Sequence, residues 1–177
     1  MTRVDPAYFP RLTFGHEVEQ DDFIQQWFGK HLRSMDEPRL YLDHAVDVVR
    51  VLTLPTFHAP RLVRFHREPK VTRITAKETT GRGGYGAGRL SLDKTIHAST
   101  NLFDEAMSAL TSIDFWKRPT LDNAIVKDGT RYVIESRIAD EYHVIERASL
   151  DCGERDLLHW INIHTQGLFQ EQGITKR

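Results

Sequence analysis

Residues 115–149 read FWKRPTLDNAIVKDGTRYVIESRIADEYHVIERAS and join an aromatic pair to a turn and two alternating segments. A two-residue turn at 139–140 would pair Ser136 with His143 and make the two segments an antiparallel hairpin. Because successive side chains of a strand point to opposite faces, this register places Glu135 and His143 on opposite faces. The stretch therefore predicts part of an antiparallel sheet, and it holds no catalytic or metal-binding signature at the required spacing.

Both faces of the predicted hairpin mix apolar and ionisable side chains. One face carries Tyr132, Ile134, Ser136, Ile138, Glu141, His143, Ile145 and Arg147, and the other carries Val133, Glu135, Arg137, Tyr142, Val144 and Glu146. A shift of the register by one residue would rearrange these two sets.

Four strands are predicted before the hairpin, at residues 45–54, 61–66, 71–78 and 89–98. The first is rich in β-branched residues and apolar on much of both faces, which is typical of a central strand. The fourth alternates between apolar and polar residues, as a half-exposed strand does.

Apolar residues at helical spacing predict three helices, over residues 23–35, 102–113 and 151–168. Asp21 and Asp22 are candidate N-caps of the first helix, and residues 99–101 offer caps for the second. Asp151 and Glu154 have the spacing of a capping box at the start of the third.

The order of elements is helix, four strands, helix, two strands, helix, which lacks the strict alternation of a parallel doubly wound sheet. We therefore expect an α+β fold, in which an antiparallel sheet of about six strands carries about three packed helices. A length of 177 residues suits a single domain over residues 1–177, with residues 1–20 as an irregular N-terminal arm.

The composition is that of an ordinary globular protein, with 40% hydrophobic residues, 28% charged residues and a formal charge of -1. This balance gives no overall attraction to nucleic acid or to an anionic membrane. The single cysteine, Cys152, cannot form an internal disulfide. No signal-peptide core or run of ~20 apolar residues is present, so a cytoplasmic location without a membrane partner is expected.

The glycine-rich segment GRGGYGAG, residues 81–88, matches the letters of a dinucleotide-binding GxGxxG motif. That motif must lead from a strand into a helix, but a strand is predicted after residue 88. We therefore interpret the segment as a flexible loop between strands, with nucleotide binding as the lesser alternative. At its tip, Arg82 and Tyr85 are available to contact a partner.

Glu135, His143 and Arg147 are the best candidates for a polar site, because the hairpin brings them close in space. A carboxylate beside an imidazole can act in general acid–base catalysis. The predicted register separates Glu135 from His143, so a structural role for Glu135 is favoured. The spacing of the nine histidines matches no metal motif, and the sequence predicts no metal and no cofactor.

A local basic band runs from Arg61 to Lys77, where Glu68 is the one acidic residue. The basic residues of this band are Arg61, Arg64, Arg67, Lys70, Arg73 and Lys77. Strand alternation divides them between two faces, so a solvated edge competes with a binding patch for an acidic protein surface. Nucleic acid is the less favoured partner, because interleaved aromatic residues and known RNA-binding motifs are missing.

The chain resembles a family of uncharacterised bacterial proteins in the pattern FWxxP, DG, Tyr132, Glu135, YH and Arg147. The resemblance covers residues 46–168 and includes the GGY segment. It implies a bacterial origin and supports the hairpin, but it brings no activity with it. Ala139 and Asp140 stand where the family commonly has a glycine-containing turn.

These observations predict a non-catalytic protein that binds another protein, in the form of a bacterial immunity protein that inhibits a toxin with an acidic surface. The expected partner-binding residues are Arg61, Arg64, Arg67, Arg73, Arg82 and Tyr85. The alternative is a small enzyme or ligand-binding protein with a polar pocket between the sheet and a helix, near Glu135, His143 and Arg147. A subunit of an assembly is a third alternative, and the oligomeric state stays open.

Overall fold

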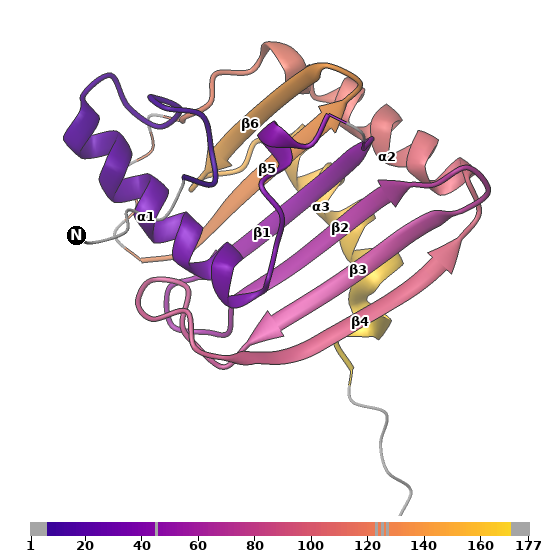
Figure 1. Cartoon of the computed structure of the whole chain (residues 1–177), viewed down its shortest axis with the longest axis horizontal. Coiled ribbons are helices and arrows are strands. Elements are labelled where there is room, and N and C mark those ends of the chain that lie inside the picture. Colours follow the sequence, from indigo (N-terminus) through magenta and orange to yellow (C-terminus); the bar gives the residue numbers. More distant parts are fainter. Residues whose placement is uncertain (1–6, 45, 123, 125, 127, 171–177) are drawn as a thin grey trace, which may run out of the picture.

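The protein is an α+β domain built on one six-stranded antiparallel sheet, in the order β4-β3-β2-β1-β5-β6 (Figure 1). The computed structural model describes residues 7–44, 46–122, 124, 126 and 128–170. The strands are β1 Val48–Pro55, β2 Arg61–Arg67, β3 Thr72–Thr79, β4 Leu90–Ala98, β5 Thr130–Ile138 and β6 Glu141–Arg147. The helices are α1 Val18–Ser34, α2 Asn101–Ser112 and α3 Cys152–Thr165. This architecture confirms the expected fold class.

The first four strands form a meander, and α2 then carries the chain across the sheet so that β5 pairs with the free side of β1. The strand predicted to be central, β1, therefore lies between β2 and β5, although Ala45 at the start of that prediction is outside the described residues. The hairpin register is confirmed, because Ser136 pairs with His143 across β5 and β6. Its turn uses a positive φ of 51° at Ala139.

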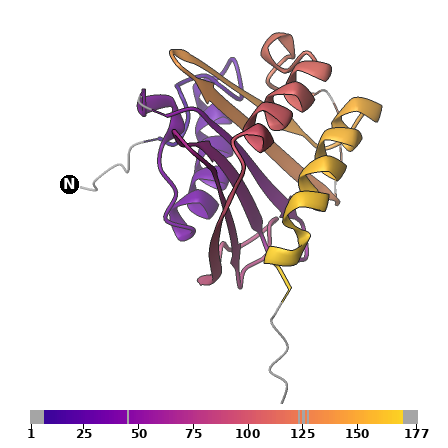
Figure 2. The ribbon, with the colours of Figure 1, turned by 90° about the vertical axis from the view of Figure 1, so that its right-hand side faces the viewer.

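The helices cover both faces of the sheet, with α2 and α3 on one side and α1 on the other (Figure 2). We call these the helix-pair face and the α1 face. Alternation along the strands divides the apolar residues between two cores. The core on the helix-pair face contains Val49, Val51, Val63, Phe65, Ile74, Phe103, Leu110, Phe115, Ile134, Ile145 and Leu157. The core on the α1 face contains Phe9, Phe14, Phe28, Leu32, Met35, Leu52, Leu54, Leu62, Val133 and Val144.

Residues 7–17 of the predicted arm have no regular secondary structure and are docked against α1, whereas residues 18–20 already belong to that helix, so the predicted arm was three residues too long. Asp21 does not cap that helix, whose N-cap residue is Glu17. The buried carboxylate of Asp21 instead accepts hydrogen bonds from the backbone N–H groups of Leu12 and Phe14, each 2.8 Å long. The capping prediction for Asp21 was wrong because this carboxylate binds the preceding arm rather than the first helical turn.

The other two helices begin differently from each other. The capping box at the start of α3 is confirmed, since Asp151 accepts from the Glu154 N–H at 2.8 Å and Glu154 accepts from the Asp151 N–H at 3.1 Å. No side chain from residues 99–101 caps α2 in this way; the hydroxyl of Thr72 on β3 accepts from the Phe103 N–H at 3.2 Å. Among the described residues, no helix is both long and apolar enough to span a membrane.

Candidate functional site

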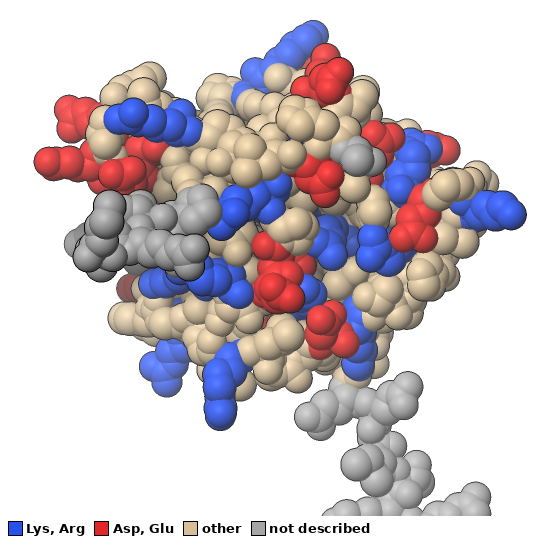
Figure 3. Space-filling view, viewed as in Figure 1, with Lys and Arg blue, Asp and Glu red and all other residues tan. Residues whose placement is uncertain are grey.

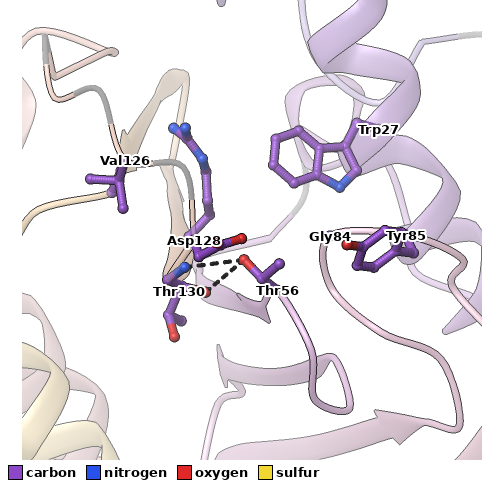
Figure 4. Close-up of a pocket in the computed structure, with 10 residues that line it drawn as sticks. Trp27, Thr56, Gly84, Tyr85, Val126, Asp128 and Thr130 are labelled. Atoms are coloured by element: carbon purple, nitrogen blue, oxygen red, sulfur yellow. Dashed lines mark hydrogen bonds between the residues drawn. The ribbon is translucent and has the colours of Figure 1, made fainter.

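The glycine-rich loop lies at the end of the sheet where β1 and β5 meet α1, and it forms one wall of a pocket of about 210 Å³ (Figure 4). We call this the aromatic pocket. Its lining residues are Trp27, Thr56, Gly84, Tyr85, Val126, Asp128, Gly129, Thr130, Arg131 and Ala148. The loop runs directly into β4, so the helix that a dinucleotide-binding motif requires is absent from this part of the described chain.

Hydrogen bonds tie the glycine-rich loop to neighbouring elements, and its interpretation as a flexible connection stays a prediction. The Trp27 indole N–H donates to the Gly83 carbonyl at 2.8 Å, and the Gly83 N–H donates to the Pro55 carbonyl at 3.0 Å. A Cβ atom at Gly83 would lie 2.5 Å from the carbonyl carbon of Leu54, so only glycine fits there. The loop is thus packed between the end of β1 and the middle of α1.

The floor of the aromatic pocket is polar and its rim is aromatic. The Thr56 hydroxyl accepts from the Gly129 N–H at 3.2 Å and donates to the Gly129 carbonyl at 3.0 Å, as the dashed lines of Figure 4 show. The Arg131 guanidinium lies 5.7 Å from the centre of the Trp27 ring and donates to Glu146 at 2.6 Å. The pocket therefore offers a polar base and an aromatic wall to a guest side chain.

Two aromatic side chains stand exposed at this rim. Phe57 and Tyr85 are 51% and 56% exposed, and their ring centres lie 6.1 Å apart. Arg82, three residues before Tyr85, is also exposed, and it makes no ion pair with any described residue. The sequence predicted Arg82 and Tyr85 as contact residues but missed Trp27 and Phe57. An aromatic residue in the turn-forming segment PTFHAP was the available signal for Phe57.

The six residues predicted to bind a partner do not form one surface. Arg61 and Arg67 lie on the helix-pair face, over the rings of Phe169 and Phe103. Arg64 and Arg73 lie on the α1 face. Each of the four is paired with an acid in the described structure: Arg61 with Glu78, Arg64 with Glu37, Arg67 with Asp47 and Asp104, and Arg73 with Glu68.

The α1 face accordingly shows basic and acidic atoms interspersed over the middle of the sheet rather than a continuous basic patch (Figure 3). Of the predicted set, Arg82 and Tyr85 on the glycine-rich loop are exposed and have no acidic partner among the described residues, and Tyr85 lines the aromatic pocket. The exposed and unpaired part of the predicted set is therefore smaller than the sequence indicated.

Glu135, His143 and Arg147 do not converge. Glu135 is buried on the α1 face, whereas His143 lies on the helix-pair face, with its ring centre 5.1 Å from that of Phe115 and 6.4 Å from that of Trp116. Burial lowers the pKa of the His143 imidazole, helped by Arg147 and opposed by the Arg118 carbonyl.

Arg147 is buried and donates to Glu154 at 2.6 Å and to the Pro119 carbonyl at 2.9 Å. A pocket of about 250 Å³ does lie between the sheet and α3, but none of these three residues lines it. The alternative polar site is therefore not assembled by the fold.

Glu135 instead belongs to a buried charge cluster that the sequence did not reveal. Arg50 donates to its carboxylate through Nε at 2.9 Å and Nη2 at 2.7 Å, and the Tyr142 hydroxyl donates at 2.9 Å. Burial raises the pKa of the Glu135 carboxyl, and Arg50 opposes this shift. Glu37 completes the cluster by contacting three cations, Arg50 at 3.3 Å, Arg64 at 2.9 Å and Lys77 at 3.0 Å. An arginine within the apolar run VVRVL was the signal available in the sequence.

His31 on α1 gives stability a pH dependence near the glycine-rich loop. Burial lowers the pKa of its imidazole to about 4, Lys30 adds to this effect, and the Gly83 backbone opposes it. In the unfolded chain the pKa returns to 6.5, so between pH 6.5 and 4 the unfolded state binds a proton that the folded state excludes. Stability contributed by neutral His31 is therefore present above about pH 6.5 and lost as the pH falls.

We expect the free energy of unfolding to fall by about 2–3 kcal/mol because of His31 when the pH is lowered from about 7.5 to about 4.5. Urea denaturation at the two pH values should show that His31→Gln removes this part of the pH dependence. His16→Gln is the matched control, because His16 is exposed. An unchanged pH dependence in His31→Gln would contradict the assignment.

Among the described residues, no group of three or more His, Cys, Asp and Glu side chains is placed to hold a metal ion. Comparison with protein-family models finds no match, and comparison with curated proteins finds none. The resemblance to uncharacterised bacterial proteins therefore rests on its motif residues alone.

Proposed function

We propose that the protein is a non-catalytic binding protein that holds an acidic protein partner at the aromatic pocket. The observation that carries this proposal is the pair of exposed aromatic rings, Phe57 and Tyr85, standing beside a pocket at the end of the sheet. Both rings lie on ordered connections whose backbone is tied to neighbouring elements, so their exposure is built into the fold.

The composition of this surface is that of a protein-binding site. Tyrosine, tryptophan and arginine dominate the energetically important positions of protein interfaces, and such residues cluster around pockets that a partner side chain fills. Trp27, Tyr85 and Arg82 bring all three residue types together here. Phe23, 69% exposed and one helical turn before Trp27, extends the apolar surface along α1.

Volume and charge define the partner's chemistry. A cavity of about 210 Å³ accommodates one side chain rather than a cofactor or a nucleotide, and the rings of Trp27 and Tyr85 in its wall favour a guest with an apolar part. Arg82 and Arg89 are exposed on the same loop, and opposite charge across an interface directs association and accelerates it. The proposed contact segment of the partner therefore places an apolar side chain next to aspartate or glutamate.

The specific role that we propose is inhibition: a bacterial immunity protein in the cytoplasm that covers the acidic surface of a toxin. Such a protein needs a stable scaffold and one complementary surface, but no catalytic residues. The six-stranded sheet with its two cores supplies the scaffold, and the aromatic pocket supplies the surface.

Selection from a phage-displayed library of random peptides tests the binding proposal directly. We expect the enriched peptides to share an apolar residue flanked by acidic residues. Synthetic copies of them should bind at least tenfold more weakly to Tyr85→Ala and to Arg82→Glu, since each substitution removes one part of the recognition.

Two controls make the result specific. Ile163→Ala removes an apolar side chain that is 53% exposed on α3, away from the pocket, and should leave peptide binding unchanged. Enrichment of peptides without acidic residues, or binding that survives both loop substitutions, would overturn the proposal.

A further inference from the structure

A second pocket, on the α1 face, is separate from the aromatic pocket and shares no residue with it. It has a volume of about 220 Å³ and lies where the segment after α1 passes over β1, β2 and β3. Its lining residues are Pro38, Leu40, Asp43, Val46, Val48, Arg64, His66 and Arg73. We call it the basic pocket, because three nitrogen-bearing side chains from β2 and β3 form one side of it.

The sheet holds these three side chains in a fixed arrangement. Arg64 and His66 are two residues apart on β2 and so point to the same face, and Arg73 on β3 is the direct cross-strand partner of His66. The Arg73 guanidinium donates to Nδ1 of His66. In a neutral imidazole the proton then resides on Nε2, so His66 is a hydrogen-bond donor there. Two guanidinium groups and one ring N–H thus converge from neighbouring strands.

The two arginines keep hydrogen-bond donors beyond those used in the printed internal contacts, since Arg64 contacts Glu37 through Nη1 while Arg73 contacts Glu68 through Nε and His66 through Nη2. The buried cluster joins three cations, Arg50, Arg64 and Lys77, to Glu37 and Glu135, and Lys77 also lies 3.9 Å from Asp93. Glu37 is shared by all three cations, so it cannot fully neutralise Arg64. The pKa of the Arg64 guanidinium is lowered, first by burial and further by Arg50 and Arg73, while Glu37 and Asp93 act against the shift.

Charges of both signs surround His66 at the pocket itself. Arg64 and Arg73 lower the pKa of its imidazole together with burial, the largest cause, while Glu68 and Asp43 raise it. Glu68 is 2.8 Å from Arg73 Nε, and Asp43 lines the pocket. The lining carries two guanidinium groups and one carboxylate, Asp43, and each guanidinium group is also paired with an acid outside the lining, Arg64 with Glu37 and Arg73 with Glu68.

The opposite side of the pocket is apolar. Leu40 and Val48 are each 1% exposed, and Pro38 and Val46 complete this wall. The volume lies below the roughly 300–1,000 Å³ of pockets for drug-sized ligands, so the guest must be a small molecule. A guest molecule with one charged end and one short aliphatic end would match the two sides of the pocket.

We propose that the basic pocket binds a small aliphatic carboxylate, whose oxygens accept hydrogen bonds from Arg64, His66 and Arg73 while its hydrocarbon part packs on Leu40 and Val48. Guanidinium groups recognise carboxylates through paired, charge-assisted hydrogen bonds, which makes this ion the best match to the donors. This site is independent of the protein-binding surface, and either proposal can fail without the other.

Titration calorimetry with 3-methylbutanoate tests the inference, and 3-methylbutan-1-ol serves as the ligand of matched shape without charge. We expect the carboxylate to bind and the alcohol to bind at least tenfold more weakly. Inorganic phosphate, which has charge but no hydrocarbon part, should also bind at least tenfold more weakly. If 3-methylbutan-1-ol or inorganic phosphate bound as tightly as 3-methylbutanoate, the proposal that the pocket recognises both a charged and an apolar group would be overturned.

The residues are tested by Arg73→Gln, which should weaken 3-methylbutanoate binding at least tenfold. Arg67→Gln is the matched control, because Arg67 lies on the same pair of strands but faces α2, and it should bind as the parent does. In the parent protein, NMR spectra should place the largest ligand-induced shifts at His66 and Val48. Shifts centred elsewhere, or undiminished binding by Arg73→Gln, would reject the site whatever the stability of the variants.

Discussion

Replacing Glu135 with alanine is expected to lower the free energy of unfolding by about 3–5 kcal/mol, because breaking a buried ion pair leaves an uncompensated charge in the interior. The side chains of Glu135 and Arg50 are both 0% exposed, and Arg50 donates two hydrogen bonds to the same carboxylate oxygen. After the substitution, Glu37 remains as the nearby carboxylate, already shared with Arg64 and Lys77. The total free energy of unfolding of a typical domain is only about 5–15 kcal/mol, so this single change removes a large part of the stability.

Urea denaturation checks this prediction. Urea is uncharged, whereas a guanidinium salt would screen the charges. Glu141→Ala is the control in the same hairpin, because Glu141 is exposed, and it should change stability by less than about 0.5 kcal/mol. The double variant Arg50→Met/Glu135→Leu should recover part of the loss, since apolar replacement of both partners removes the unpaired charge. A loss below about 1 kcal/mol in Glu135→Ala would show that the pair is not a major source of stability.

The sequence was sufficient to predict local structure and the pairing of neighbouring strands. The register of β5 and β6 follows from a short turn and from alternation, so Ser136 opposite His143 was predictable without any distant contact. The same register places Glu135 and His143 on opposite faces of the sheet. The capping box of Asp151 and Glu154 was predictable for the same reason, because its two partners lie within one helical turn.

Partners that are distant in the chain could not be predicted. Arg50 and Glu135 are 85 residues apart, and they meet only because β5 crosses back to pair with β1. The Phe103 N–H in the first turn of α2 donates to the hydroxyl of Thr72, which lies 31 residues earlier in the chain. Each of these contacts depends on the tertiary fold, which no local pattern encodes.

The basic band shows a related limit for predicting surfaces. Its arginines are close in sequence, but alternation sends Arg61 to one face and Arg64 to the other. Their acidic partners come from β3, from α2, from the segment after α1 and from the connecting loops. Charge counted along a strand therefore overstated the charge available to a partner, whereas Arg82 on a loop was correctly expected to be exposed.

Replacing Phe9 with alanine is expected to cost about 3–5 kcal/mol of unfolding free energy, although Phe9 lies in an arm without regular secondary structure. The ring is 0% exposed and packs edge-on against Phe14, with ring centres 4.9 Å apart. It also contacts Phe28 of α1 at a centre distance of 6.4 Å. Truncation leaves a cavity between the arm and the helix that these aromatic rings cannot easily fill, because Asp21 holds the arm backbone in place.

Chemical denaturation measures the free energy of unfolding of Phe9→Ala and of Leu12→Ala. The comparison distinguishes the effect of truncating a buried side chain from the effect of changing any residue of the arm. Leu12 is 48% exposed, so its truncation should change stability by less than about 0.5 kcal/mol. Both residues belong to the same irregular segment. A loss of unfolding free energy that is confined to Phe9→Ala, in a single cooperative transition, would therefore show that the arm unfolds together with the sheet. Small and equal effects of the two variants would instead mean that α1 and the sheet fold without the arm. In that case the hydrogen bonds of Asp21 would contribute little to the stability of the domain, and the aromatic cluster would be a peripheral contact.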